Sequence, residues 1–342
     1  MTDFSINNDF TKLIGCKYPI VCAPMFLVSY EKLVIAASEA GALGSAPSLN
    51  WRTVDEFQKA VKTIKAGTNK PYAINLIVNK SVPRQHKDLE ICAEEKVPVV
   101  ITSLGSPKET IKLMHQVGGK VFCDVTNLEY AKKVEDLGAD GVVAVAAGAG
   151  GHAGPTSPLV LIPYLKKHLS IPVLAAGGIA TGEQMAATMI LGASAAYIGT
   201  RFIASKEANV DTHYKNAILE SQPHDIVMTE KISGTPAAVI KTPYIEKAGL
   251  RMNPVESYLM KHPKTKKYVK MFRAYVGSKM LEKAAGTTTW KEVWSAGQGV
   301  GLIDEVLSAE EIVNKLIKEY HTAWRNNIPP TTTNAKPMNT SA

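Results

Sequence analysis

A histidine lies inside the glycine-rich stretch 148–155 (GAGGHAGP), which follows an apolar run at 142–147. Four glycines and a proline within eight residues are incompatible with a regular helix or strand and indicate a loop. Histidine is the side chain whose ordinary pKa lies nearest neutrality, so it can exchange a proton at physiological pH. A loop that exposes His152 at a strand end therefore indicates proton chemistry. The alternative is a glycine-rich turn that carries a surface histidine.

Two further stretches have the composition of phosphate-binding loops. Gly177 and Gly178 follow an apolar run and precede a helical pattern that begins at Thr181, and Gly199 and Thr200 follow the next apolar run. Paired glycines let backbone N–H groups approach an anion closely, and a helix N-terminus adds a favourable dipole. Either stretch alone is better explained as a tight turn between a strand and a helix.

The elements that carry these stretches alternate between apolar runs and amphipathic helical patterns. Short runs rich in Val, Ile and Ala predict strands of a parallel sheet buried on both faces, at 19–24, 43–46, 72–77, 97–102, 120–125, 141–146, 172–176 and 195–199. Helical patterns lie between them, for example at 53–65 and 128–137. This alternation predicts an α/β fold, a (β/α)8 TIM barrel. A doubly wound sheet is the alternative, but residues 22–25 (CAPM) stand where that fold carries its G-x-G-x-x-G turn.

The order of these strands places the candidate phosphate-binding turns and His152 at one end of the barrel. Active sites of such barrels lie at the carboxyl ends of the strands, and phosphate commonly binds between the loops after strands seven and eight. Residues 177–178 and 199–200 hold these two positions, which favours a phosphate-bearing ligand, and His152 follows strand six at the same mouth. Other strand ends contribute Pro24, Met25, Asn75 and Asp124. A flat, partly apolar and partly amide-lined pocket suits FMN, although these residues alone do not distinguish FMN from a sugar phosphate.

Composition argues against several classes of protein. The four cysteines form no C-x-x-C pair and no histidines lie at metal-ligand spacing, which argues against a metal site or a disulfide framework and predicts a reducing, cytoplasmic setting. The first 17 residues lack the apolar core of a signal peptide, and no uninterrupted apolar run reaches the length of a membrane span. The net charge of +8 is modest and concentrated at 261–283, so no nucleic-acid partner is expected.

After residue 200 the pattern changes. A helix is predicted at 207–220, an irregular stretch at 226–250, helical segments at 254–285, a tight loop at 294–299 and a closing helix at 308–324. The basic segment 261–283 is predicted to be an amphipathic helix with a solvated face, the alternative being a docking surface for an anionic nucleotide or acyl carrier protein. The predicted domains are a barrel at 1–204, a mostly helical lid at 205–300, a C-terminal helix at 301–327 and a disordered tail at 328–342.

The combination of motifs in this order resembles the nitronate monooxygenase family, formerly called 2-nitropropane dioxygenases. The resemblance covers residues 18–320 and rests on the segments 18–20 with 23–25, 150–154, 176–179, 199–202 and 295–298. It implies an FMN-binding barrel with a lid domain inserted after strand eight. It also implies oxidation of alkyl nitronates by dioxygen to a carbonyl compound and nitrite, with neutral nitroalkanes as further candidate substrates.

Carried onto this sequence, the resemblance implies that His152 is the catalytic base. It implies FMN contacts from the glycine-rich loops and the strand ends, namely Ala23, Pro24, Met25, Asn75, Asp124, Gly150, Gly151, Ala176, Gly177, Gly178, Gly199, Thr200 and Gln298. No metal is implied. The expected partners are a small-molecule substrate, dioxygen and a second copy of the chain in a homodimer, without nucleic acid or membrane.

The sequence departs from the family pattern at three places. Residues 148–150 (GAG) stand where many members carry an acidic residue, Ala23 and Pro24 where some carry glutamine or glycine, and Asp124 where one branch carries lysine. These departures leave two alternatives open. One is an FMN-dependent NAD(P)H reductase acting on an enoyl-acyl carrier protein or a quinone, and the other is a flavin-binding protein without turnover. His152 argues against the latter, because a flavin carrier needs no base in its pocket.

Overall fold

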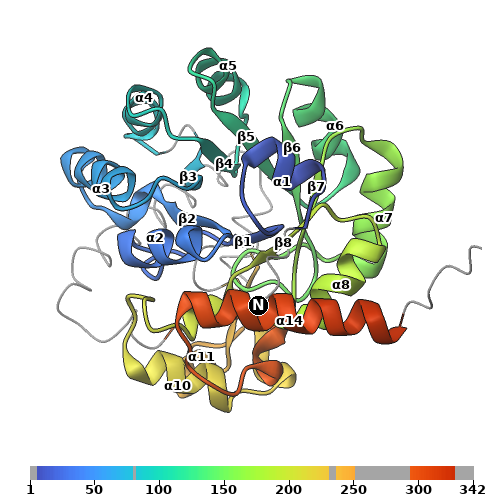
Figure 1. Cartoon of the computed structure of the whole chain (residues 1–342). Helices are drawn as coiled ribbons and strands as arrows, with labels where there is room; N and C mark the ends of the chain where they lie inside the picture. Colours follow the sequence, from blue (N-terminus) through green and yellow to red (C-terminus); the bar gives the residue numbers. More distant parts are fainter. Residues whose placement is uncertain (1–5, 80–81, 231–235, 251–292, 328–342) are drawn as a thin grey trace, which may run out of the picture.

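Eight parallel strands close into a barrel in the computed structural model, which describes residues 6–79, 82–230, 236–250 and 293–327 (Figure 1). Each strand pairs with the next along the chain, and β8 pairs with β1. The strands are β1 (Ile20–Cys22), β2 (Leu43–Pro47), β3 (Tyr72–Ile77), β4 (Val99–Ser103), β5 (Lys120–Val125), β6 (Gly141–Val145), β7 (Val173–Ala176) and β8 (Ala195–Ile198). The predicted (β/α)8 barrel is confirmed.

Three strands begin later than the sequence predicted, and each begins directly after a proline. Pro19, Pro98 and Pro172 precede β1, β4 and β7. Proline has no backbone N–H to donate to a strand ladder, so regular pairing starts at the next residue. The apolar runs therefore predict all eight strands correctly, but they place the first residues of β1, β4 and β7 too early.

Helices surround the barrel (Figure 1). They are α2 (Glu31–Glu39), α3 (Val54–Gly67), α4 (Gln85–Glu94), α5 (Lys108–Gln116), α6 (Leu128–Asp136), α7 (Pro158–His168) and α8 (Gly182–Ile190). The short α9 (Thr200–Ile203) follows β8, and α14 (Ala309–Asn327) packs against α8 and α2 to complete the ring. A Cβ on Gly182 would lie 2.1 Å from the Leu316 carbonyl oxygen, so only glycine allows α8 and α14 to approach this closely.

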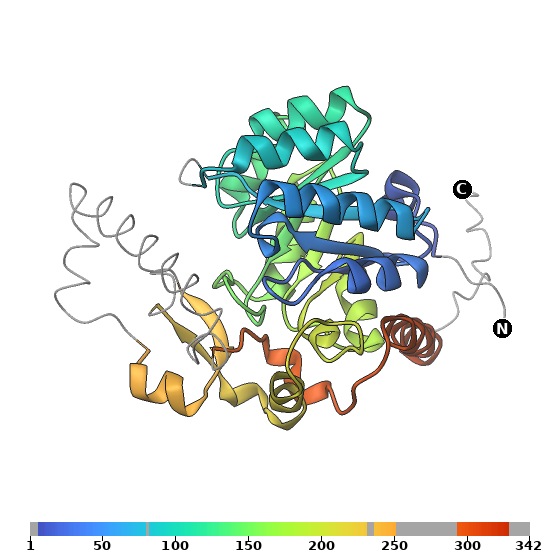
Figure 2. The same cartoon turned by 90° about the vertical axis from the view of Figure 1, so that its left-hand side faces the viewer.

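The amino end of the barrel is filled by side chains. Helix α1 (Asp9–Ile14) precedes β1 and inserts the fully buried Phe10, whose ring lies edge-on to Phe122 of β5 with centroids 5.8 Å apart. Phe10 and Phe122 share an inner core with Val21, Leu43 and Val143. Figure 2 shows α1 on one side of the barrel and the orange segment of β9, β10 and α11 toward the opposite end. The carboxyl ends of the strands therefore form the open mouth.

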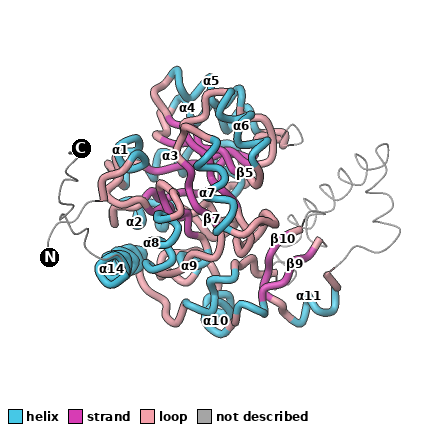
Figure 3. Tube along the Cα trace, turned by 90° about the vertical axis from the view of Figure 1, so that its right-hand side faces the viewer, coloured by secondary structure: helices cyan, strands magenta, loops and turns pink. Residues whose placement is uncertain are grey.

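The chain after β8 forms α10 (Thr212–Glu220), the 3₁₀ turn η2 (Pro223–Asp225), β9 (Ile226–Thr229), β10 (Ala237–Ile240), α11 (Pro243–Ala248) and η3 (Gln298–Leu302). The prediction of an irregular stretch at 226–250 is wrong, because β9 and β10 pair antiparallel beside the barrel (Figure 3). Each has four residues, too few to produce a periodic signal. Helix α10 begins five residues later than predicted, where Asp211 accepts a hydrogen bond from the His213 N–H. The predicted helical segments at 254–285 and the tail at 328–342 lie outside the described residues.

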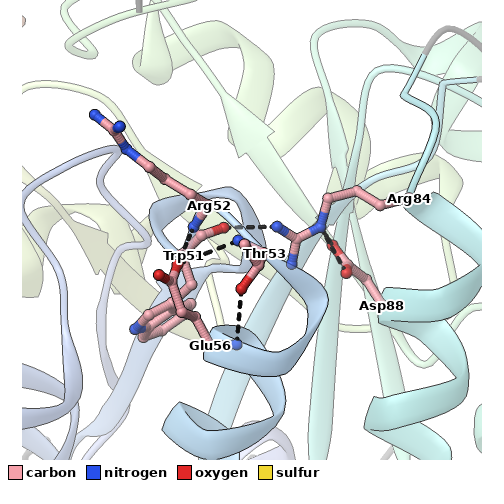
Figure 4. Close-up of polar contacts among 6 residues, drawn as sticks. All are labelled: Trp51, Arg52, Thr53, Glu56, Arg84 and Asp88. Carbon is pink, nitrogen blue, oxygen red and sulfur yellow. Dashed lines mark hydrogen bonds and ion pairs between the residues drawn. The ribbon is translucent and has the colours of Figure 1, made fainter. Parts of the chain in front are cut away.

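An ion pair holds two loops together at the mouth. Arg84 donates through Nε to Asp88 (2.8 Å) and through Nη1 to the carbonyl oxygen of Trp51 (2.6 Å), which joins the start of α4 to the loop between β2 and α3 (Figure 4). In that loop Thr53 and Glu56 form a reciprocal cap at the start of α3. Asp88 is 1% exposed, and burial raises the pKa of its carboxyl group. A hydrogen bond from the Ser48 side chain and the charge of Arg84 oppose this effect and favour the ionised carboxylate.

The substitution Arg84→Met should lower the free energy of unfolding by about 3 kcal/mol, because it removes the only charged partner that the structure gives the buried Asp88 carboxylate and leaves it the Ser48 hydrogen bond. Lys133→Met is the matched control: Lys133 and Glu129 have the same i,i+4 spacing and a 2.6 Å contact, but both are exposed. The control should change stability far less, because water screens an exposed pair. Denaturant unfolding of both variants measures this difference. Equal losses of stability would show that burial does not increase the contribution of the Arg84–Asp88 pair to stability.

Candidate active site

The loop that carries His152 folds back over the end of β6. Gly148 and Gly151 adopt φ angles of 88° and 67°, which side chains rarely allow. The Ala147 N–H donates to the Thr156 carbonyl oxygen at 2.8 Å and closes the loop. A Cβ on Gly154 would lie 2.4 Å from the carbonyl oxygen of Val145. The φ angles at Gly148 and Gly151 and the close backbone contact at Gly154 therefore require glycine at these three positions.

Two segments distant in sequence fix this loop in place. Gly151 forms an antiparallel bridge with Ala238 of β10 through hydrogen bonds of 3.0 and 2.7 Å. On the other side the Gln298 N–H donates to the Gly148 carbonyl oxygen at 2.9 Å. A Cβ on Gly150 would lie 2.9 Å from the Gly297 nitrogen, so the two backbones are in direct contact. The residue before His152 is therefore held by β10, and no pattern in the sequence indicated this pairing.

The His152 side chain is exposed, yet neighbouring protein partly desolvates its ring and lowers its pKa from the ordinary value of 6.5. Desolvation disfavours the charged imidazolium. The ring is therefore mostly neutral at pH 7 and can accept a proton. This state is the one that a general base requires.

The loops after β7 and β8 lie beside the His152 loop. A Cβ on Gly177 (φ 137°) would lie 2.9 Å from the Ala147 carbonyl oxygen. At Gly178 (φ 71°) the nearest atom to such a Cβ would be 3.9 Å away, so this turn faces open space. The Thr200 hydroxyl accepts the Gly297 N–H at 2.9 Å and links the turn after β8 to residues 296–298.

Backbone donors remain available at these turns. Among the described residues, the N–H groups of Gly178 and Gly199 form no hydrogen bond, and both glycines are partly accessible. A Cβ on Gly199 would lie 3.7 Å from the sulfur of Met25, which places the end of β1 beside the turn after β8. Unpaired N–H groups at glycine turns form a cradle suited to an anion.

A polar chain crosses the inside of the barrel below the mouth. Asn75 on β3 donates through Nδ2 to Ser103 on β4 (2.8 Å), and the Ser103 hydroxyl donates to Oδ2 of Asp124 on β5 (2.5 Å). Asp124 alternates with the inner-core residue Phe122 and so points into the barrel. Ser103 was not predicted from the sequence. Its place two residues after the inner-core residue Ile101 was the signal that could have identified it.

Asp124 is an ionisable group in a poorly solvated position. Burial raises the pKa of its carboxyl group to about 6, against the opposing effect of the Ser103 hydrogen bond. The residue as a whole is partly accessible, but its Oδ1 atom is buried and has no hydrogen-bond partner. On β8, burial and then the charge of Asp124 raise the pKa of Tyr197. Asp124 is therefore ionised at pH 7 at a cost in stability.

The structure gathers the predicted residues into two groups. The first is a rim of backbone turns made by Gly150, Gly151, Gly177, Gly178, Gly199, Thr200 and Gln298, with the end of β1 (Ala23, Pro24 and Met25) beside it. The second is the interior pair Asn75 and Asp124 joined by Ser103. Ala176 is buried and accepts the Ala146 N–H at 2.8 Å, which ties β7 to β6. Their contacts with a cofactor stay predictions.

The described part of the chain has no cluster of three or more His, Cys, Asp or Glu side chains that could hold a metal ion. None of the described helices is both long and apolar enough to cross a membrane. A closed (β/α)8 barrel with a histidine loop and open backbone donors at the carboxyl ends of its strands has the architecture of a barrel enzyme. The chain belongs to the nitronate monooxygenase family, whose family model matches residues 7–90 and 80–319, and it is an oxidoreductase.

Known proteins with three different names, two curated sequences and one solved structure, resemble the chain over most of its length. A probable nitronate monooxygenase of Staphylococcus saprophyticus is 29% identical and covers 92% of this chain and 98% of its own. A 5-hydroxy-7a-methyl-1-oxo-octahydro-1H-indene-4-carboxyl-CoA dehydrogenase of Mycobacterium tuberculosis is 27% identical, covering 91% and 95%. The solved structure of FabK from Thermotoga maritima is 32% identical with a TM-score of 0.81 and covers 94% of this chain and 98% of its own.

Asp124→Asn should stabilise the ligand-free protein by about 2 kcal/mol at pH 8 and much less at pH 4.5. The raised pKa means that the folded state binds more protons than the unfolded state between pH 4 and 6, so native stability falls as pH rises through this window. Asparagine removes that loss and keeps an acceptor for Ser103. Denaturant unfolding at both pH values measures the effect.

Asp140→Asn is the matched control. Asp140 is also poorly exposed, but it pairs with Lys120 (3.1 Å) and His115 (2.8 Å), so its neutralisation should destabilise the protein at pH 8. If Asp124→Asn also destabilises the protein at pH 8, the charge of Asp124 is compensated in the folded state and the prediction is wrong.

Proposed function

We propose that this protein is an FMN-dependent nitronate monooxygenase that oxidises alkyl nitronates with dioxygen to a carbonyl compound and nitrite, with His152 as the catalytic base. The observation that carries the proposal is the backbone contact that holds the His152 loop beside the open turns after β7 and β8. Membership of the family supports it. A homodimer in a cytoplasmic setting and a lid formed by residues 205–300 are further parts of the proposal.

The residues at the mouth fit FMN. Gly178 and Gly199 present unpaired N–H groups that can hold one phosphate, with Gly177 and Thr200 shaping the two turns. Bound FMN would supply the two-electron redox chemistry. The strand-end residues Ala23, Pro24, Met25, Asn75 and Asp124, together with Gly150, Gly151, Ala176 and Gln298, would surround its ring and ribityl chain.

His152 would act through its neutral imidazole. A nitroalkane must lose a carbon-bound proton before it can be oxidised, whereas a nitronate has already lost it. The lowered pKa keeps the ring unprotonated at pH 7, and the bridge between Gly151 and Ala238 restricts where the ring can lie. A base on a restrained loop takes a proton in a defined geometry.

The second candidate is an FMN-dependent NAD(P)H reductase acting on an enoyl thioester or a quinone. The similarity to a protein named as a carboxyl-CoA dehydrogenase favours it. Nitrite release from a nitronate under air with negligible NAD(P)H oxidation supports the monooxygenase, and rapid anaerobic bleaching of the flavin by NADH or NADPH supports the reductase. A flavin-binding protein without turnover would show neither reaction.

Gly178→Asp should reduce FMN binding at least tenfold, because it places a carboxylate against the proposed phosphate position. Gly118→Asp is the matched control, since Gly118 also has a positive φ (82°) and open space but lies at the turn before β5, on the amino side of the barrel. Fluorescence titration of FMN into both apoproteins measures affinity. Unchanged FMN affinity in a folded Gly178→Asp protein would place the phosphate elsewhere.

His152→Asn should lower kcat/KM for a neutral nitroalkane by on the order of 10²–10⁴, the usual contribution of a general base, and should affect a preformed nitronate much less. In the unchanged enzyme, kcat/KM for the nitroalkane should fall at acidic pH with an apparent pKa below the ordinary histidine value of 6.5, because the base becomes protonated there. Steady-state nitrite assays measure both effects.

His213→Asn provides the control, because His213 is an exposed histidine on α10. Equal losses on nitroalkane and nitronate would indicate that His152 binds the substrate rather than removing its proton.

A further inference from the structure

Arg201 is a buried arginine that directly follows the turn after β8. It lies in the short helix α9, which packs beside α14 (Figure 3), and only 5% of its surface is exposed. Its Nη2 atom donates to the Glu305 carbonyl oxygen at 2.8 Å and more weakly to the Ala204 carbonyl oxygen at 3.5 Å. Arginine is rarely this buried without an ionic partner, so the position of this charge needs a physical reason.

Direct contact does not cancel the charge of Arg201. In the described parts of the chain, no carboxylate forms an ion pair with its guanidinium. Burial lowers the pKa of this group, and the charges of Glu305, Asp304 and Glu319 oppose that effect. Glu305 is exposed and pairs with Lys315 at 2.8 Å, so water and the lysine weaken its influence. Because arginine stays protonated in proteins, α9 carries a buried positive charge that is only partly compensated.

Helix α9 also holds the segment 297–305 at both of its ends. Thr200 accepts the N–H of the first residue of this segment, and Arg201 donates to the carbonyl oxygen of the last. Between these ends, a Cβ on Gly299 would lie 3.1 Å from the Gly178 carbonyl oxygen, so the segment contacts the turn after β7. Arg201 therefore fixes backbone that packs against the proposed phosphate position.

We propose that Arg201 makes this site select a phosphorylated flavin over an unphosphorylated one, by holding the surrounding backbone in place and by supplying a buried positive charge. The inference rests on the proposed function, which places the FMN phosphate at the unpaired N–H groups of Gly178 and Gly199. Water and salt screen a buried charge weakly, so it favours an anion even without direct contact. Arg201 is a positioning residue in this role, because the backbone N–H groups would hold the phosphate itself.

Titration of the apoprotein with FMN and with riboflavin tests the inference, because riboflavin has the same ring and ribityl chain without the phosphate. The unchanged protein should bind FMN more tightly than riboflavin. Arg201→Gln can still donate a hydrogen bond but carries no charge, and it should lower the ratio of FMN affinity to riboflavin affinity about tenfold. Arg201→Lys keeps the charge and should keep the preference for FMN. Quenching of flavin fluorescence measures each affinity.

Lys206→Gln is the matched control. It removes a positive charge shortly after α9, but Lys206 is exposed and pairs with Glu311 at 2.9 Å, so the ratio of the two affinities should stay the same. An unchanged ratio in folded Arg201→Gln overturns the inference and leaves the proposed function standing. An equal loss of affinity for both flavins does the same, because it would show that Arg201 only supports the fold.

The unchanged protein tests the proposed function separately. If it binds FMN and riboflavin equally well, the proposed phosphate position is wrong and the inference fails with it. Should Arg201→Gln not fold, Arg201→Lys decides. A folded Arg201→Lys protein that no longer prefers FMN contradicts a role for the charge and overturns the inference.

Discussion

Backbone segments at the mouth of this barrel approach one another more closely than any side chain would permit. A Cβ on Gly297 would lie 2.4 Å from the Gly148 carbonyl oxygen, and one on Gly177 would lie 2.9 Å from that of Ala147. These contacts bring the ends of β6 and β7 and the segment 296–298 into one layer. Because the backbone N–H groups of this layer have fixed directions, the site is organised before any ligand binds. Such preorganisation reduces the cost of ordering a site on binding.

The same constraint positions His152. Its loop is held by β10 on one side and by Gln298 on the other, so His152 lies on irregular backbone that is nevertheless restrained. Strand β10 in turn pairs with residues 294–295, since the Ile240 N–H donates to the Trp294 carbonyl oxygen at 2.8 Å. Tyr214 of α10 stacks on Trp294 and donates to the Ser295 carbonyl oxygen at 2.6 Å. The elements after β8 therefore support the His152 loop through main-chain hydrogen bonds and through the contacts of Tyr214.

Polar groups inside the barrel are confined to its open end. Toward the amino end the interior is filled by Phe10, Phe122 and their aliphatic neighbours, whereas inward positions nearer the carboxyl ends of β3, β4 and β5 carry Asn75, Ser103 and Asp124. Hydrogen bonds satisfy most of this polar set, and one carboxylate oxygen remains. Buried polar atoms are normally paired, so this oxygen is one of the few exceptions among the described residues.

The sequence by itself determined the barrel, because buried parallel strands need continuous apolar runs and each run ends in a turn that glycine makes possible. It also determined the glycine-rich loop of His152 and the two turns after β7 and β8, since strand order fixes where they lie. The tertiary structure alone decided the pairing of Gly151 with Ala238, the hydrogen bonds that join Asn75, Ser103 and Asp124, and the unsatisfied oxygen of Asp124. These features depend on contacts between residues far apart in the chain, and local sequence patterns record periodicity and turns but not which distant backbones meet.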